Sequence, residues 1–223
     1  MDYMASIKFN IKPIDKPSTT KERVYNEIKH VILSGYISSE EIFTEVKLAE
    51  LLNTSRTPVR EALQDLIKEG LIVSIPRKGM TVRRVTESEI EQIFLLRTSI
   101  ETKIIRKLAK IITPEQLKML KNICKQQKEA MLANDDIAFI KLDQLFHTSL
   151  VKFVDFELIE QVLLNLHNLS QLIGLRAIKK SNRMNEVLEE HMSIISCMES
   201  KDEEKSGEAM TLHLNNTKHT LIN

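Results

Sequence analysis

The segment that decides the fold is Ser55-Arg56-Thr57-Pro58-Val59-Arg60-Glu61-Ala62-Leu63. We expect it to begin a helix whose two sides differ in character. Arg56 and Arg60 are four residues apart and therefore share one face. Val59 and Leu63 belong to an apolar face on the other side, and Gly70 supplies a stop for the helix. This arrangement is typical of a helix that enters a DNA groove.

The beginning of this helix carries further signals. Ser55 or Thr57 can cap it, and Pro58 suits a first helical turn. The N–H groups of a first turn also favour a phosphate. The alternative is an ordinary solvated helix, in which Glu61 and Asp65 would pair with the arginines.

Two more helices are expected before the arginine helix. The capping box Thr19-Thr20-Lys21-Glu22 opens a helix that ends near Gly35. Thr44 caps a short helix that ends at Asn53, directly before the arginine helix. Two helices joined by a tight turn, the second with basic residues at its start, form a helix-turn-helix.

A β-hairpin is expected after Gly70. Residues 71–75 are rich in β-branched side chains, and residues 80–85 alternate in their second half. Arg77, Lys78 and Gly79 lie at the turn, where the glycine would let the backbone approach a phosphate or the floor of the minor groove. We interpret the hairpin as the wing of a winged helix-turn-helix.

Composition sets the class of the protein. The chain has 223 residues, a formal net charge of +1, few glycines and no tryptophan, which favours a mainly α-helical protein. Cys124 and Cys197 match no metal or redox spacing and are expected to be reduced thiols. With neither a signal peptide nor a membrane span in the sequence, we expect a cytoplasmic protein that does not contact membranes.

The chain divides into three expected parts. Residues 1–17 form a flexible N-terminal arm, residues 18–85 the winged helix-turn-helix, and residues 86–223 an all-α helical bundle that forms a second domain. The helices expected in that bundle span residues 86–111, 113–134, 136–154, 156–178, 184–199 and 203–221.

Four polar residues point toward the interior of this bundle. On a helical wheel His191 and His213 each lie within an apolar stripe, while Asp143 and His147 are spaced i, i+4. One explanation is a set of hydrogen-bonded core histidines. The other is a shared divalent metal, since burying four polar groups is costly unless they have common partners. Imidazole and carboxylate ligands suit Zn²⁺, Ni²⁺, Fe²⁺ or Mn²⁺.

Arg97 and Glu101 also lie in the centre of an apolar stripe. They can form an internal ion pair, or Arg97 can line a cavity and bind a ligand carboxylate. Arg176 is a weaker candidate for the same pocket. His167 is expected to be a core or pocket-wall residue.

These features together resemble the GntR family of bacterial transcription regulators, in particular its FadR-like subfamily with an all-helical FCD effector domain. The resemblance covers about residues 19–220 and rests on several motifs: Leu48-Ala49-Glu50, Ser55 to Leu63, Glu69-Gly70-Leu71, Arg77 to Val82, Arg97-x3-Glu101, Asp143-x2-Phe146-His147, Glu190-His191 and His213.

The resemblance implies roles for individual residues. DNA contacts would come from the start of the arginine helix and from the wing, namely Ser55, Arg56, Thr57, Arg60, Arg77, Lys78 and Gly79. The metal ligands would be Asp143, His147, His191 and His213, with zinc or nickel preferred over manganese or iron. Arg97 would hold a carboxylate effector. The sequence departs from some relatives at Val46, where they carry a further DNA-contacting arginine, so Lys47 becomes the candidate there.

The sequence therefore predicts a homodimeric DNA-binding regulator, more typically a repressor, and not an enzyme. Its operator would be an inverted repeat, and a small organic acid would bind in the metal-containing bundle. Two alternatives stay open: a metal-dependent enzyme, and a metal sensor whose metal is itself the effector.

Overall fold

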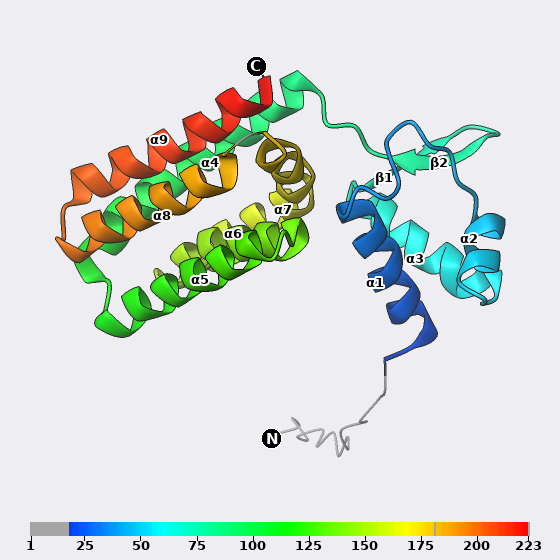
Figure 1. Cartoon of the computed structure of the whole chain (residues 1–223), viewed down its shortest axis with the longest axis horizontal. Coiled ribbons are helices and arrows are strands. Elements are labelled where there is room, and N and C mark those ends of the chain that lie inside the picture. The colour runs from blue at the N-terminus through cyan, green and yellow to red at the C-terminus, as the bar shows by residue number, and fades with distance from the viewer. Residues whose placement is uncertain (1–17, 181, 223) are drawn as a thin grey trace, which may run out of the picture.

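The computed structural model describes residues 18–180 and 182–222; the arm expected at residues 1–17 lies outside them. The described chain is mainly α-helical and forms two lobes, with one two-stranded sheet in the first lobe (Figure 1). The elements are α1 (Thr20–Leu33), α2 (Glu45–Leu51), α3 (Arg56–Lys68), β1 (Ile72–Ile75), β2 (Gly79–Val82), α4 (Glu87–Ile111), α5 (Pro114–Leu132), α6 (Asp136–Lys152), α7 (Glu157–Ile178), α8 (Arg183–Glu199) and α9 (Glu203–Ile222).

The first domain packs α1, α2 and the hairpin around α3. The inner face of α3 is fully buried at Val59, Leu63 and Leu66, and α1 contributes Ile28 and Ile32 to the same core. These residues recur at the spacing of one helical face, so the hydrophobic effect fixes which side of α3 faces outward. The face that carries the two arginines is therefore left to solvent.

The expected helix boundaries are confirmed at most ends. Complete capping boxes begin α1 at Thr19, α4 at Thr86 and α5 at Thr113. Asn53 and Asn134 follow α2 and α5 with positive φ angles of 47° and 54°, as residues after a helix C-cap often do. Capping boxes and positive-φ residues act within one helical turn, so they can be recognised from neighbouring residues in the sequence.

The hairpin is shorter than the sequence predicted. Ile72 pairs with Val82 and Ile75 with Gly79, so the second strand ends at Val82 and not at Val85. The expected extension to Val85 was wrong because that side chain leaves the hairpin. The Val85 side chain is buried in the hydrophobic core of the second domain. The chain between Val82 and Val85 becomes the interdomain linker.

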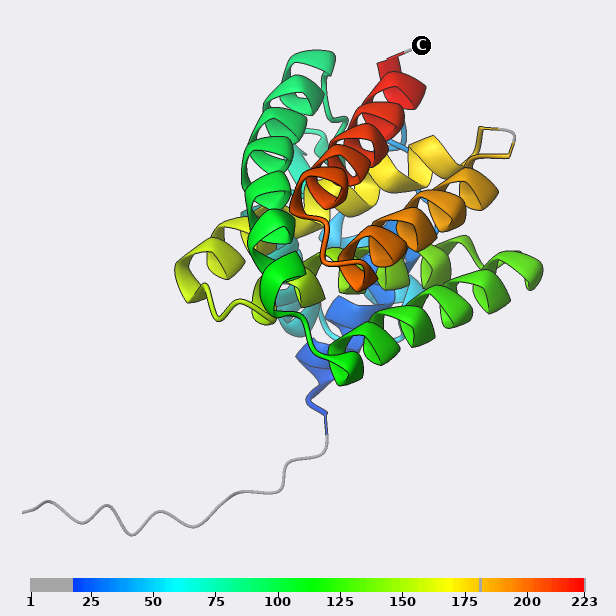
Figure 2. The same ribbon diagram turned by 90° about the vertical axis from the view of Figure 1, so that its left-hand side faces the viewer.

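The second domain is a bundle of the six helices from α4 to α9. Seen end-on, α4 lies beside α9, and α5 lies beside α8 (Figure 2). Its core contains Ile90, Phe146, Leu150 and Ile194, all fully buried. No described helix is long and apolar enough to span a lipid bilayer.

The two domains share apolar packing at their junction. Leu175 and Ile178 of α7 and Ile140 of α6 belong to the same hydrophobic cluster as the core of the first domain. A polar contact adds to it, because the Asn168 side chain of α7 donates a hydrogen bond to Glu69 at the end of α3 (2.9 Å). α7 therefore connects the bundle to the end of the arginine helix.

Candidate functional site

The start of α3 presents Arg56, Thr57 and Arg60 on its exposed face. Ser55 occupies the N-cap position, but its side chain makes no capping hydrogen bond. The first-turn N–H groups of α3 therefore lack a side-chain cap from Ser55, and such groups can bind a phosphate.

Glu45 contacts both arginines from the start of α2. Arg60 donates from Nε and Nη2 to the Glu45 carboxylate at 3.0–3.1 Å, and Arg56 Nη2 lies 3.5 Å from the same group. The hydrogen bonds from Arg60 hold the pKa of Glu45 below its ordinary value. The sequence suggested Glu61 and Asp65 as partners and missed Glu45, which is distant along the chain.

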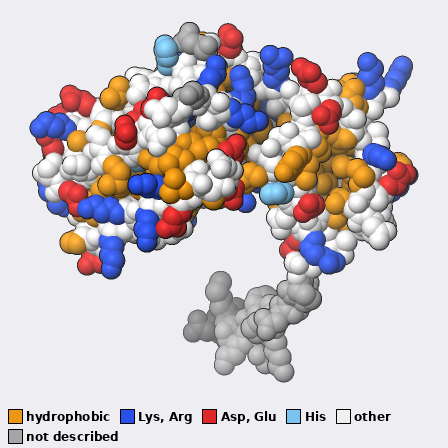
Figure 3. Space-filling model, viewed as in Figure 1, with side chains coloured by type: hydrophobic (Ala, Val, Ile, Leu, Met, Phe, Trp, Pro, Cys, Tyr) orange, Lys and Arg blue, Asp and Glu red, His pale blue; other side chains and the backbone are white. Residues whose placement is uncertain are grey.

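Arg77 and Lys78 form the tip of the hairpin and are exposed. Figure 3 shows Lys and Arg side chains projecting at the end of the molecule where Figure 1 places this hairpin. Gly79 has a structural role that the sequence did not reveal. Its φ is +136°, and a Cβ there would lie 2.5 Å from the carbonyl oxygen of Phe43.

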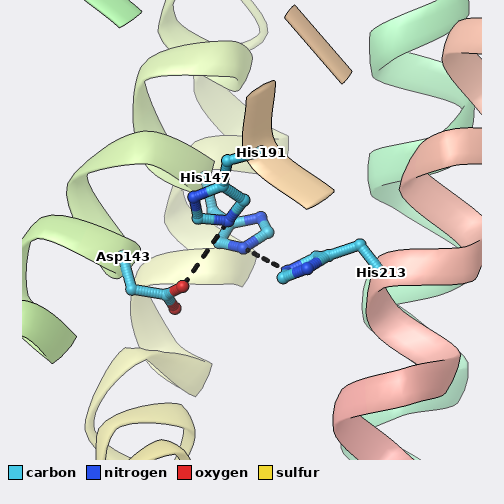
Figure 4. Close-up of side chains that lie close together, drawn as sticks. All are labelled: Asp143, His147, His191 and His213. Carbon is cyan, nitrogen blue, oxygen red and sulfur yellow. Dashed lines mark hydrogen bonds and ion pairs between the residues drawn. The ribbon is translucent and has the colours of Figure 1, made fainter. Parts of the chain in front are cut away.

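Inside the bundle, Asp143, His147, His191 and His213 converge on one point (Figure 4). One potential ligand atom from each residue lies within 4.8 Å of the others. His147 Nε2 is 3.2 Å from His213 Nε2, and His191 Nε2 is 3.6 Å from Asp143 Oδ1. The structure thus brings together all four residues that the sequence proposed as metal ligands.

Each of the three imidazoles is anchored through its Nδ1 atom. The acceptors are Glu101 for His147 (2.5 Å), Glu190 for His213 (2.7 Å) and Gln127 for His191 (3.1 Å). Because a carboxylate or amide oxygen only accepts, Nδ1 carries the hydrogen in each ring. Every Nε2 lone pair is then free to face the common centre.

The electrostatics favour neutral rings at His191 and His213 and ionised carboxylates at Glu101 and Glu190, as the directions of their pKa shifts indicate. Burial, followed by the neighbouring His213 and His147, holds the pKa of His191 well below its usual range, which favours the neutral ring. Burial opposes ionisation of Glu101, but Arg97 and His147 outweigh it and hold its pKa well below normal. Glu190 follows the same logic, since His213 and Arg183 overcome burial and lower its pKa to about 2.

This donor set fits a divalent transition metal. Two ligand atoms at about 2.1 Å from a tetrahedral zinc ion lie roughly 3.4 Å apart, close to the 3.2 Å between His147 and His213 and the 3.6 Å between His191 and Asp143. His191 Nε2 is fully buried and has no hydrogen-bond partner in the described chain, as expected of a ligand atom awaiting a metal. Phe146 stacks on the His191 ring at a centroid distance of 4.0 Å and fixes its plane.

Two buried arginines hold the carboxylates that anchor the histidines. Arg97 donates from Nε to Glu101 (2.7 Å). Arg183 donates to both oxygens of Glu190 at 2.8 and 2.9 Å. Arg183 and Gln127 were not found from the sequence. Gln127 contacts His191 on another helix, and Arg183 lies on the same helix as Glu190 but acts through the contact of Glu190 with His213 on α9. A helical wheel that began at Arg183 would have placed this cation on the buried face of α8 with Val187 and His191.

Small cavities of about 20 and 10 Å³ adjoin the cluster, and Arg97 lines both. Its Nη2 atom is buried without a partner in the described structure, although Arg97 also forms the ion pair with Glu101. A cavity of 10–15 Å³ holds about one water molecule, so these cavities are too small for an organic acid in this conformation. Arg176 is not brought to these cavities, and its Nη1 donates to the Val85 carbonyl (3.3 Å). The His167 side chain lies outside the described residues.

Cys124 is not an activated thiol. Cys124 is buried, and burial together with Asp143 raises its pKa to about 12. A thiol with so high a pKa is a poor nucleophile near neutral pH.

Comparison with known proteins gives two matches to family models. Residues 20–82 match the model described as bacterial regulatory proteins, gntR family, and residues 92–216 match the FCD domain.

Individual proteins agree with these matches. The chain is 30% identical over 190 residues to the gluconate operon transcriptional repressor of Bacillus subtilis (strain 168), covering 83% of this chain and 78% of that protein. It is 26% identical to the HTH-type transcriptional repressor RspR of Escherichia coli (strain K12), over 86% and 85%. The solved structure of E. coli McbR/YncC has the same fold, with a TM-score of 0.74, 20% identity and coverage of 92% and 98%.

Proposed function

Because the chain belongs to the GntR family of bacterial regulatory proteins and carries an FCD domain, we propose that it is a transcriptional repressor controlled by a small carboxylate. The repressor would act in the cytoplasm, where bacterial DNA is found. The observation that carries the proposal is the exposed pair Arg56 and Arg60 at the start of a helix whose opposite face is buried.

The DNA-binding part of the proposal uses the start of α3 and the tip of the hairpin. Arg56, Thr57 and Arg60 would contact a major groove, where arginine suits the O6 and N7 atoms of guanine. Arg77 and Lys78 would follow the neighbouring backbone or minor groove. A homodimer would place two such surfaces on the half-sites of an inverted repeat.

The effector part of the proposal uses the metal cluster. A divalent ion, with zinc or nickel preferred, would be held by Asp143 and the three histidines. A carboxylate effector would bind beside it and take up the free Nη2 donor of Arg97. The gluconate operon named for one relative concerns a carboxylate, which agrees with this class of effector.

The small volume of the cavities beside the cluster favours a second candidate, in which the metal alone is the effector. A pocket of about 20 Å³ has no room for an organic acid unless side chains move. The two candidates differ in a simple observation. In a metal sensor, operator affinity follows the free metal concentration without any added acid.

The DNA-binding proposal is tested by selecting operator fragments from genomic DNA with the purified protein. We expect an inverted repeat to be enriched and Arg60→Ala to weaken its binding by about 10–100-fold at fixed salt. Lys68→Ala is the matched control, because Lys68 is an exposed cation at the other end of α3. Equal effects of the two variants would show that α3 contributes only general charge.

A further inference from the structure

A cavity of about 390 Å³ lies where the two domains meet and is separate from the metal cluster. Its walls are the turn at residues 34–39, the linker at residues 82–85 and the outer face of α7. Leu172 and Leu175 supply an apolar surface within it. The volume falls in the range of about 300–1,000 Å³ that is usual for small-molecule sites.

Basic side chains converge on this cavity from both domains. Arg83, Arg84, Arg176 and Lys179 all line it. Arg83 is neutralised by an ion pair with Glu89. The other three form no ion pair with any carboxylate of the described residues.

The acidic charge at the cavity is small. Asp136 is the one acidic side chain among the described lining residues. It is the first residue of α6, where the positive end of the helix dipole already favours a carboxylate. The three cations therefore surround a space that lacks a matching negative charge.

We propose that this cavity binds a compact organic anion that carries at least two phosphate or carboxylate charges. Arginine forks suit both groups, and the apolar wall would receive the carbon skeleton. The ligand would be distinct from the effector at the metal cluster. It would touch the linker, α7 and the first domain together, so that its binding would stabilise one arrangement of the domains.

DNA contact and helix capping account less well for these basic residues. Contact with DNA phosphates would need the cavity to face the DNA, but the start of α3 and the hairpin tip lie at the far end of the first domain from α7 (Figure 1). A capping role accounts for Lys179, which directly follows α7. It does not account for Arg84, which belongs to the linker.

The test is calorimetric titration of the metal-free, full-length protein with inorganic pyrophosphate at low ionic strength. We expect saturable binding of one pyrophosphate per chain. Arg84→Gln and Lys179→Gln should each weaken it about tenfold. Lys180→Gln is the matched control, because Lys180 is exposed and adjacent in sequence but does not line the cavity. No saturable binding, or equal weakening by all three variants, would overturn the proposal.

Two further measurements separate the possible sources of the anion. A parallel titration uses tricarballylate, which carries carboxylates in place of phosphates. Tighter binding of pyrophosphate assigns the ligand to the phosphates, and tighter binding of tricarballylate assigns it to the carboxylates. The Arg84→Gln, Lys179→Gln double variant should keep its affinity for the selected operator. If the double variant binds the operator more weakly in the absence of ligand, and this binding depends less on salt, then the cations contact DNA and the proposal fails.

Discussion

At the scale of single residues, Glu45 gives the arginine pair of α3 a defined geometry. It occupies the Nε and Nη2 edge of Arg60 and approaches Arg56. An arginine held along one edge loses side-chain freedom before it meets DNA, and this reduces the entropy lost on binding. The remaining donors of Arg60 point away from Glu45 and are available to a base or a phosphate.

Glu45→Ala should therefore lower sequence discrimination. We expect the ratio of specific to non-specific DNA affinity to fall about fivefold, while non-specific affinity rises because a negative charge is lost. Fluorescence anisotropy with operator and scrambled fragments measures both. Glu50→Ala is the control, since Glu50 is an exposed glutamate on α2 whose one ion pair among the described residues is with Lys47. An equal change of the ratio in both variants would contradict a positioning role.

Gly79→Ala addresses the hairpin. The added Cβ would meet the Phe43 carbonyl at 2.5 Å, and alanine disfavours a φ of +136°. We expect the variant to be less stable by about 1–3 kcal/mol in urea unfolding. Ser74→Ala, at an exposed position in the same hairpin, should be close to neutral. Weaker DNA binding with unchanged stability would instead mean that the glycine serves contact with DNA.

At the scale of elements, the sequence predicted what is encoded locally. Helix ends follow from capping boxes and from positive-φ residues, and the cluster of Asp143 with three histidines follows from polar residues on apolar helical faces. Glu45 and Gln127 were missed because their partners lie on other helices. Arg183 was missed because its role depends on the contact of Glu190 with His213 of α9. Only the packing of α2 on α3, and of α5 and α9 around α8, brings these groups together.

α7 is placed to connect the two sites. One face lines the cavities beside the metal cluster through Ser170 and Gly174, and another face reaches the end of α3 through Asn168 and Glu69. Tyr25 and Lys29 of α1 also donate to the Glu69 carboxylate. A shift of α7 would thus change contacts at the C-terminal end of α3.

Asn168→Ala should weaken the coupling between the sites while leaving metal binding intact. We expect the carboxylate effector to change operator affinity by a factor at least three times smaller than in the native protein. This corresponds to a loss of about 0.7 kcal/mol of coupling free energy. Operator titrations with and without the acid measure this factor. Gln161→Ala, an exposed position on α7, is the control. Unchanged coupling in Asn168→Ala would exclude this contact from the transmission.

At the scale of the whole molecule, the proposed metal would contribute part of the stability of the bundle. Asp143 and the three histidines point inward, and the buried Nε2 atom of His191 has no hydrogen-bond partner among the described residues. Chelation should lower the melting temperature by roughly 5–15 °C, which corresponds to a bound ion at 100–1,000 times its Kd. His191→Ala should melt at the same temperature with and without chelator, whereas His30→Ala, at an exposed position on α1, should respond like the native protein. A native protein that is indifferent to chelation would contradict a metal in the core.

The most direct test of the account is the operator Kd of the metal-loaded protein, measured with and without the small carboxylate that binds it. That carboxylate is first identified by the rise in melting temperature it causes across a panel of organic acids. We predict that the acid changes the operator Kd by about 5–150-fold in the native protein and leaves it unchanged in His191→Ala. An acid that binds the native protein and yet leaves the operator Kd unchanged would contradict the account.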